Sequence, residues 1–465
     1  MRTTLTMTGT QHELLRAHLF PGDGLEAVAL MLCGRCETPG LHRLLVHQVV
    51  PVPHSECHRA KDRVTWPTSR LKDLLEQAAG SGLAVAKIHS HPDGLAAFSP
   101  VDDAADAELF SSVAAAVDDG RPHLSAIMLP DGRVIARAHD GDGGHGPLDQ
   151  VAVIGDDLHF WHCKAPSPEP LPEFALRHAQ AFGRGTFERL RRLRVAVVGC
   201  SGTGSVVVDQ LARLGVGRIV LVDPDRVEEK NLNRIVNAVR GDVGRLKVEV
   251  LGDFIQRLGL GTAVEALPLD LSDPAALRAV AACDVAFGCM DSVDGRDLLN
   301  RLATFHLLAY FDVGVRLDAD GQGGIDQICG SAHYVQPGRS SLRTRGVYTD
   351  ADLEAAALRR SDPAAYAEKV RRGYLRGVDE DRPAVNAVNA LFSSLAVIDF
   401  LLRLHPGRID PNGDFAAQTM SLTAGLYLQA AERGPDEALL RHVGRGDMSP
   451  PLGRPYLDML RRRGS

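Results

Sequence analysis

The chain has 465 residues, of which 45% are hydrophobic and 24% are charged. This length exceeds one typical hydrophobic core and predicts two or three domains, and the composition excludes a disordered or fibrous chain. The formal net charge of −7 disfavours a nucleic-acid partner, because phosphate binding needs a basic surface.

The cysteines and the N-terminal segment predict a cellular compartment. The eight cysteines show no disulfide-framework spacing, which favours a reducing environment. Residues 1–20 lack the apolar core and cleavage pattern of a signal peptide. No apolar run approaches the length of a membrane span, so we expect a cytoplasmic protein with no membrane partner.

The first predicted domain mixes strands and helices. Apolar runs ending at turns predict strands, and apolar residues at helical spacing predict helices. Together they predict a mixed α/β domain over residues 1–163. Its expected strands are 25–34, 41–54, 83–92 and a pair joined by a turn within 123–139, and its expected helices are 69–82 and 102–117.

A proline-rich segment, residues 164–174, reads as a linker to a second domain over residues 175–465. From residue 194 the chain alternates strands and helices, which predicts a mainly parallel, Rossmann-like sheet. The remaining expected features of this domain are a charged excursion at 343–382, a buried helix at 386–404 and a C-terminal extension at 404–465.

The stretch "HSHPDGLAAFSPVD" predicts a metal site. His89 and His91 alternate at a strand end, so both imidazoles point to one face. Asp102 begins the next helix and could fold back as a third ligand, which leaves the fourth position of zinc open for water. Glu26 is the expected general base and Ser99 the expected oxyanion donor. Alone, a His-x-His pair is common, and Ser-Pro-x-Asp is also an ordinary helix start.

The combination is more restrictive than its parts. His-x-His, seven residues, Ser, two residues and Asp, with the upstream Glu26, resembles the JAB/MPN (JAMM) metalloprotease signature over roughly residues 15–140. The resemblance implies one catalytic zinc in the N-terminal domain. It also implies cleavage of peptide or isopeptide bonds after the C-terminal glycine of a ubiquitin-like protein.

The stretch "RVAVVGCSGTGS", residues 194–205, predicts a nucleotide-binding turn between a strand and a helix. Gly199, Gly202 and Gly204 let the backbone approach a phosphate closely. The next strand ends at Asp223, which suits a ribose hydroxyl. A dehydrogenase would show the same pattern up to this point.

Charged residues further along the chain favour adenylation over hydride transfer. An adenylating enzyme must neutralise a triphosphate and hold Mg²⁺ while the α-phosphate is attacked. Arg296 could also be an ordinary surface charge. The residues expected to meet this need are Asn231, Arg234, Lys247, Asp291 and Arg296.

Their spacing resembles the ThiF/MoeB/ubiquitin-activating adenylation family, from about residue 173 to at least 403. The resemblance implies ATP with Mg²⁺, with Asp291 as the magnesium-linked acid. It implies that Arg177, in "RHAQAFG", reaches the phosphates from a neighbouring subunit, and therefore a homodimer through this domain. Two positions depart from the family pattern: Ser201 replaces a glycine and His178 replaces a glutamine.

Many members of this family hold a structural zinc with two Cys-x-x-Cys pairs. Here the corresponding segment is "PGRSSLRT", with Ser341 and Thr344 in place of cysteines, and no cysteine follows Cys329. We therefore predict no structural zinc in the second domain and no obligatory cysteine thioester. Ser340, Ser341 and Thr344 are speculative hydroxyl acceptors.

These patterns lead to three hypotheses of function. The first is a bifunctional enzyme of a bacterial-type ubiquitin-like pathway, which cleaves after a C-terminal glycine and adenylates that glycine, with a conjugating enzyme as a further candidate partner. The second is activation of a sulfur-carrier protein for cofactor or natural-product synthesis. The third, disfavoured by the intact candidate residues, is an inert scaffold for ubiquitin-like tails.

Overall fold

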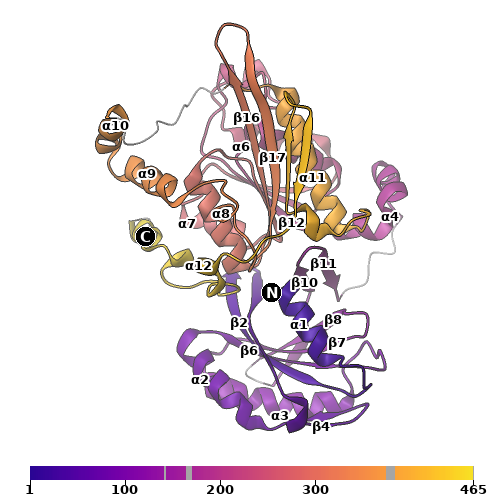
Figure 1. Cartoon of the computed structure of the whole chain (residues 1–465). Helices are drawn as coiled ribbons and strands as arrows, with labels where there is room; N and C mark the ends of the chain where they lie inside the picture. Colours follow the sequence, from indigo (N-terminus) through magenta and orange to yellow (C-terminus); the bar gives the residue numbers. More distant parts are fainter. Residues whose placement is uncertain (141–142, 164–169, 373–382, 464–465) are drawn as a thin grey trace. The chain divides into compact units, whose positions relative to one another are not determined.

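The computed structural model describes residues 1–140, 143–163, 170–372 and 383–463. The chain divides into two compact units (Figure 1). The first unit comprises Met1–Pro168, Thr304–Leu307 and Arg441–Ser449, and the second comprises Glu169–Ala303, Leu308–Leu440 and Pro450–Ser465. Parts of the predicted linker (164–169) and of the predicted excursion (373–382) lie outside the described residues.

The first unit is built on a mixed nine-stranded sheet in the order β11-β10-β1-β3-β2-β6-β7-β8-β9. β2 pairs antiparallel with β3 and β6, and β6 pairs parallel with β7. A separate antiparallel pair is formed by β4 (His58–Arg59) and β5 (Val64–Thr65). The strands of the large sheet are β1 (Arg2–Thr8), β2 (Val28–Thr38), β3 (Leu41–Pro51), β6 (Ala84–Ser90), β7 (His123–Met128), β8 (Val134–His139), β9 (His145–Pro147), β10 (Gln150–Ile154) and β11 (Leu158–His162).

This sheet is buried on both faces. Alternate residues of β2 enter two different apolar cores: Val28 and Leu30 belong to one, and Ala29 and Met31 to the other. Such a strand is continuously apolar because helices cover both of its faces. Residues of α2 (Lys72–Ser81) and α3 (Pro100–Val117) complete the first core, and residues of α1 (Gly9–Leu19) complete the second.

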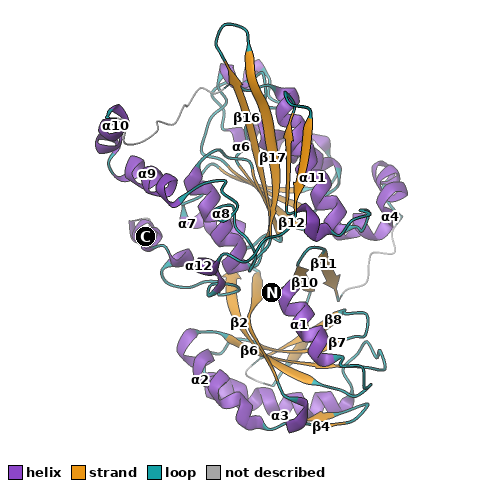
Figure 2. Cartoon of the chain, in the orientation of Figure 1, coloured by secondary structure: helices purple, strands orange, loops and turns teal. Residues whose placement is uncertain are grey.

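The second unit holds an eight-stranded sheet in the order β14-β13-β12-β15-β16-β17-β18-β19 (Figure 2). The pairings from β14 to β16 are parallel and those from β16 to β19 are antiparallel. Its strands are β12 (Arg194–Val198), β13 (Arg218–Val222), β14 (Ala263–Leu267), β15 (Val285–Gly288), β16 (Ala309–Ala319), β17 (Ile325–Val335), β18 (Ala417–Ser421) and β19 (Leu426–Ala430). Its helices are α4 (Leu176–Leu190), α5 (Gly202–Arg213), α6 (Lys247–Leu258), α7 (Pro274–Ala281), α8 (Val293–His306), α9 (Asp350–Ser361), α10 (Pro363–Arg371), α11 (Asn386–Leu404), α12 (Glu437–Leu440) and α13 (Pro455–Arg463).

Helix α11 spans the residues predicted for a buried helix and packs against α5, β16 and β17. Its outer face nevertheless exposes Leu391 and Ile398. By length and composition alone it could cross a membrane, contrary to the expectation that no apolar run is long enough, but most of its apolar window is buried in the unit. Burial of this kind is typical of the core helix of a packed domain.

The predicted fold class is confirmed in both units, with two differences in detail. Glu26 does not open a strand, because β2 begins at Val28 and Glu26 lies in the segment before it. The parallel sheet ends at β16, after which three antiparallel pairings extend it. Short turns join β16 to β17 and β18 to β19, and such turns permit only antiparallel pairing.

Candidate metal and nucleotide sites

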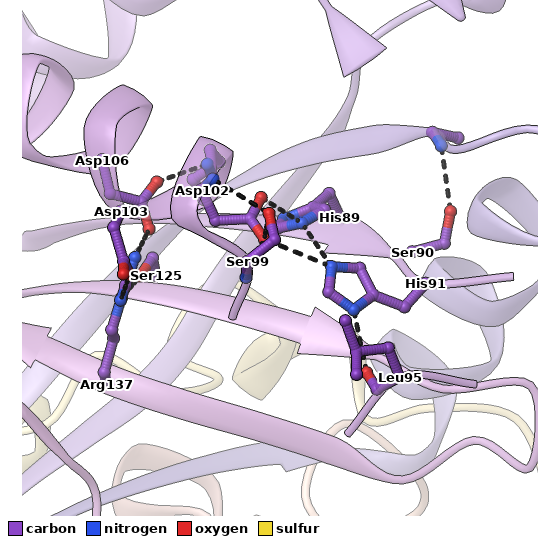
Figure 3. Close-up of polar contacts among 12 residues, drawn as sticks. His89, Ser90, His91, Leu95, Ser99, Asp102, Asp103, Asp106, Ser125 and Arg137 are labelled. Carbon is purple, nitrogen blue, oxygen red and sulfur yellow. Dashed lines mark hydrogen bonds and ion pairs between the residues drawn. The ribbon is translucent and has the colours of Figure 1, made fainter. Parts of the chain in front are cut away.

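In the first unit, three side chains bring ligand atoms together at the end of β6 (Figure 3). The Nε2 atoms of His89 and His91 lie 3.1 Å apart. Asp102 places Oδ1 2.9 Å from Nε2 of His89 and Oδ2 3.4 Å from Nε2 of His91. The structure therefore unites the three residues predicted as metal ligands.

The start of α3 fixes the position of Asp102. Ser99 is the N-cap of this helix, and the Asp102 backbone N–H donates to its hydroxyl oxygen at 3.2 Å. In return, the Ser99 hydroxyl donates to Oδ2 of Asp102 at 2.8 Å and the Ser99 backbone N–H donates to the same oxygen at 2.7 Å. This capping box orients the carboxylate toward the histidines. The hydroxyl of Ser99 is thus engaged with Asp102, and its oxyanion role stays a prediction.

Glu26 lies beside the two histidines, with one ligand atom of each of the three residues within 4.8 Å of the others. Two reciprocal hydrogen bonds between Ser90 and Ala27, at 2.9 and 3.0 Å, hold the Glu26 segment against the end of β6. Arg59 donates to the backbone oxygen of Glu26 at 2.7 Å. Glu26 is 5% exposed, and this burial raises the pKa of its carboxyl to about 7. A carboxyl tuned in this way suits general-base chemistry near neutrality.

The donor set fits a zinc ion. Burial lowers the pKa of His89, which favours the neutral imidazole that a metal requires. Burial alone would raise the pKa of Asp102, but hydrogen bonds from His89 and His91 hold it below its usual range. Nδ1 of His91 lies 2.8 Å from the Leu95 backbone oxygen, the kind of second contact that orients a ligating imidazole. Two imidazoles and one carboxylate that leave a position open are the ligands of a catalytic zinc.

The sequence patterns did not predict a buried charged network around Asp106 of α3. Asp106, one turn after Asp102 on α3, forms ion pairs with Lys87 and with Arg137, the latter at 2.8 Å. Arg137 also donates to the Ser125 hydroxyl at 3.0 Å. The network connects α3 to β6, β7 and β8 and so fixes the helix that carries Asp102 (Figure 3). The spacing could have indicated it, because positions 87 and 89 share a strand face and positions 102 and 106 share a helix face.

In the second unit, the glycine loop connects β12 to α5 at the carboxyl ends of the parallel strands, where α/β folds bind ligands. Gly199 has a φ of 90°, which favours glycine. A Cβ on Gly204 would lie 1.7 Å from the Gly199 oxygen, so this turn cannot close around a side chain. Asp223 follows β13, and its Oδ2 accepts from the Cys200 backbone N–H at 2.7 Å. The predicted ribose acid therefore lies at the loop.

Lys247 reaches the same loop from the first residue of α6. Its Nζ lies 2.7 Å from Oδ2 of Asp225 and 3.9 Å from Oδ1 of Asp223. Asn231 is buried, and its Oδ1 accepts from the Glu228 backbone N–H at 3.1 Å. The Asn231 side chain thus supports the local turn. Lys247 is a buried cation that is paired with Asp225 and lies beside Asp223, and its phosphate role stays a prediction.

Three further predicted residues occupy different environments. Asp291 is exposed just after β15. Arg296 is paired with the buried Asp312, Nε to Oδ1 at 3.1 Å, so its charge is already neutralised. Arg177 is exposed on α4 and donates to Gln180 of its own helix at 3.4 Å. The phosphate roles of these residues stay predictions.

The segment that replaces the zinc-binding cysteines is held by ion pairs. Arg345 pairs with Glu432 at 2.9 Å, and Arg343 pairs with Asp436 at 2.7 Å. The Ser341 hydroxyl donates to Asp436 at 2.7 Å. The other two speculative hydroxyl acceptors are also hydrogen-bonded within this segment. The Ser340 hydroxyl and backbone N–H donate to Glu432, and the Thr344 hydroxyl donates to the Ser341 backbone oxygen. Ser340 and Ser341 are buried, whereas Thr344 is exposed, and the acceptor role of all three stays a prediction.

The cysteines near the glycine loop are unsuited to thioester chemistry. Cys200 and Cys289 are both buried. Burial raises the pKa of both thiols, which suppresses the thiolate that a nucleophile needs. The absence of an obligatory cysteine thioester stays a prediction.

The two units match two known domain families. Residues 10–130 match the prokaryotic homologs of the JAB domain, and residues 175–400 match the ThiF family. A sulfur carrier protein adenylyltransferase of Thermus thermophilus is 39% identical over 116 residues, and a SAMP-activating enzyme E1 of Haloferax volcanii is 37% identical over 117 residues. Each match covers 25% of this chain and 43% of the relative, so the chain spans less than half of their length.

Among solved structures, E. coli MccB with ATP aligns over 59% of this chain and 76% of its own, with 18% identity and a TM-score of 0.44. By its two family matches, this chain is a fusion of a prokaryotic JAB-type domain, over residues 10–130, with a ThiF-family domain over residues 175–400.

Proposed function

We propose that the chain is a bifunctional enzyme of a ubiquitin-like protein pathway. One domain hydrolyses the bond after a C-terminal glycine, and the other adenylates such a glycine. The observation that supports the proposal is that each unit brings part of the predicted polar set together: Glu26 and Asp102 beside two histidines in the first unit, and Asp223 and Lys247 at the glycine loop in the second. A scaffold that only bound tails would need neither a buried acid beside two histidines nor a buried lysine beside a glycine loop.

In the JAB-type domain, His89, His91 and Asp102 would hold the zinc. Bound there, zinc would supply Lewis-acid polarisation of a carbonyl oxygen and lower the pKa of water. Glu26 would take a proton from water and return it to the departing amine.

In the ThiF domain, the substrate is a glycine carboxylate and the co-substrate is ATP. A carboxylate oxygen forms a bond to the α-phosphorus, the bond from that phosphorus to the β-phosphate bridging oxygen breaks, and pyrophosphate leaves. Asp223 would hold the ribose, and Lys247 would offset the growing negative charge. Asp291 would contribute to the Mg²⁺ site. Arg177 would reach the phosphates of a partner copy, which makes a homodimer part of the proposal.

Two versions of this function differ in the final acceptor of the adenylated glycine. A ubiquitin-like modifier would pass from the adenylate to a protein acceptor, whereas a sulfur carrier would pass to a sulfur donor. One relative is the sulfur carrier protein adenylyltransferase of Thermus thermophilus, which favours testing the second version alongside the first. In both versions the small-protein substrate ends in a glycine.

The test uses ATP–pyrophosphate exchange and cleavage of glycine-tailed proteins. Candidate small proteins with free C-terminal glycines are supplied to the full chain, and the same proteins fused through that glycine to a reporter are supplied as cleavage substrates. Asp291→Ala should remove exchange but not cleavage, and Glu26→Ala should remove cleavage but not exchange. Full exchange by Asp291→Ala, or full cleavage by Glu26→Ala, would contradict the proposal.

A further inference from the structure

Helix α11 contributes an asparagine to the glycine loop that the sequence patterns did not indicate. Asn389 lies in the first two turns of α11 and is 6% exposed. A Cβ added to Gly202 would lie 2.2 Å from Nδ2 of Asn389 and 3.2 Å from Cδ of Arg234. Only glycine at position 202 leaves room for this amide. Asn389, Gly202 and the stem of Arg234 therefore meet at one point.

The neighbouring polar residues of α11 have partners and Asn389 has none. Ser393 donates to the Thr203 backbone oxygen at 3.0 Å, and Ser394 accepts from Gln210 at 2.6 Å, so both tie α11 to α5. Across the described ranges 1–140, 143–163, 170–372 and 383–463, no hydrogen bond reaches the side-chain amide of Asn389. Its atoms are not among the fully buried side-chain atoms that lack a partner, so this mostly buried amide keeps some exposure. A donor without a protein partner that is not completely enclosed is open to a ligand.

The surroundings of this amide suit an anion. Helix α5 begins at Gly202, and its N-cap, Ser201, makes no side-chain cap, so the first N–H groups of α5 carry partial positive charge toward the loop. The stem of Arg234 also lies beside Gly202, while its guanidinium donates to the Lys230 backbone oxygen at 2.9 Å and to Oδ1 of Asn233 at 3.3 Å. An amide N–H₂ that faces such a point is a donor for an anionic oxygen.

We propose that Asn389 donates its side-chain amide to a phosphate oxygen of ATP bound at the glycine loop. The inference rests on the proposed adenylation function and adds to it a contact from α11, far from the loop in sequence. It also explains Gly202 as the residue that makes room for the amide. Asn389 is thus a nucleotide-binding residue and not a packing residue of α11.

The test compares ATP·Mg binding, by titration calorimetry on the full chain, among wild type, Asn389→Ala and Asn389→Asp. Asn386→Ala is the matched control, because Asn386 is exposed on the same turn of α11. A lost hydrogen bond to a charged oxygen predicts a Kd about 10- to 100-fold weaker for Asn389→Ala. Asn389→Asp should bind more weakly still, because a carboxylate would face the phosphates. Asn386→Ala should match wild type.

Thermal unfolding without ATP separates a binding role from a structural one. Since the amide has no partner among the described residues, Asn389→Ala should have the Tm of the wild type or a higher one. Ser393→Ala, which loses the hydrogen bond to Thr203, serves as the reference for a structural role and should lower the Tm. Two results would overturn the inference: Asn389→Ala binding ATP as tightly as wild type, or Asn389→Ala lowering the Tm without ATP as much as Ser393→Ala. If wild type itself fails to bind ATP, the proposed adenylation function fails and this inference fails with it.

Discussion

Replacing Asp106 by asparagine should destabilise the JAB-type unit severely. Asp106 is fully buried, and its carboxylate is the common partner of Lys87 and Arg137, whose side chains are 9% and 6% exposed. An asparagine keeps the shape but removes the charge, and two buried cations then lose their shared partner. Removing one member of a buried ion pair costs about 3–5 kcal/mol, and the exposed fractions here are too small for solvent to screen the loss.

The two tryptophans make this change measurable in the full chain. Trp66 and Trp161 are the only tryptophans in the sequence, and both belong to the first unit. Urea unfolding followed by tryptophan fluorescence therefore reports on that unit alone. With a slope of about 2 kcal/mol/M, the expected loss moves the midpoint down by about 1.5–2.5 M.

The matched control is Asp103→Asn on the same helix. Asp103 also pairs with Arg137, but its side chain is 53% exposed. An exposed pair contributes about 0–1 kcal/mol, so this variant should unfold within about 0.5 M of wild type. If Asp106→Asn unfolds at the same urea concentration as Asp103→Asn, the reasoning about the buried network is wrong.

Three further predictions concern metal binding, adenylation and the segment that replaces the structural zinc. His91→Ala removes a predicted zinc ligand. Zinc affinity, measured by chelator competition, should fall by more than the about 10- to 100-fold that is typical when a contact to a ligand, and not the ligand itself, is removed. ATP binding should not change. Lys247→Met removes the cation beside Asp223 and should slow pyrophosphate exchange about 100-fold or more, with zinc content unchanged; equal exchange would exclude the proposed role. Arg345→Met should cost the ThiF unit about 3–5 kcal/mol by circular dichroism, and Arg345→Met with Glu432→Leu should recover most of it, because an apolar pair can replace a buried ion pair.

The sequence by itself determined the fold classes and the main chemical groups. The alternation of apolar residues predicted the strands and helices because burial on one or both faces of a sheet imposes that period. The spacing from His89 to Asp102 predicted the ligand set, since a strand end and the first turn of the next helix are close in the chain. Local capping by Ser99 then orients Asp102, and capping is readable from sequence.

Only the tertiary structure decided which groups from distant segments meet. Asp106, Lys87 and Arg137 combine because α3 packs across three strands, and no pattern within one segment encodes that packing. Arg296, on α8, is paired with Asp312, on β16, so a residue predicted for phosphate already has a partner. Asn389 reaches the glycine loop through the packing of α11 on α5, although 187 positions separate it from Gly202. Long-range contacts of this kind depend on how complete elements pack, which local spacing does not record.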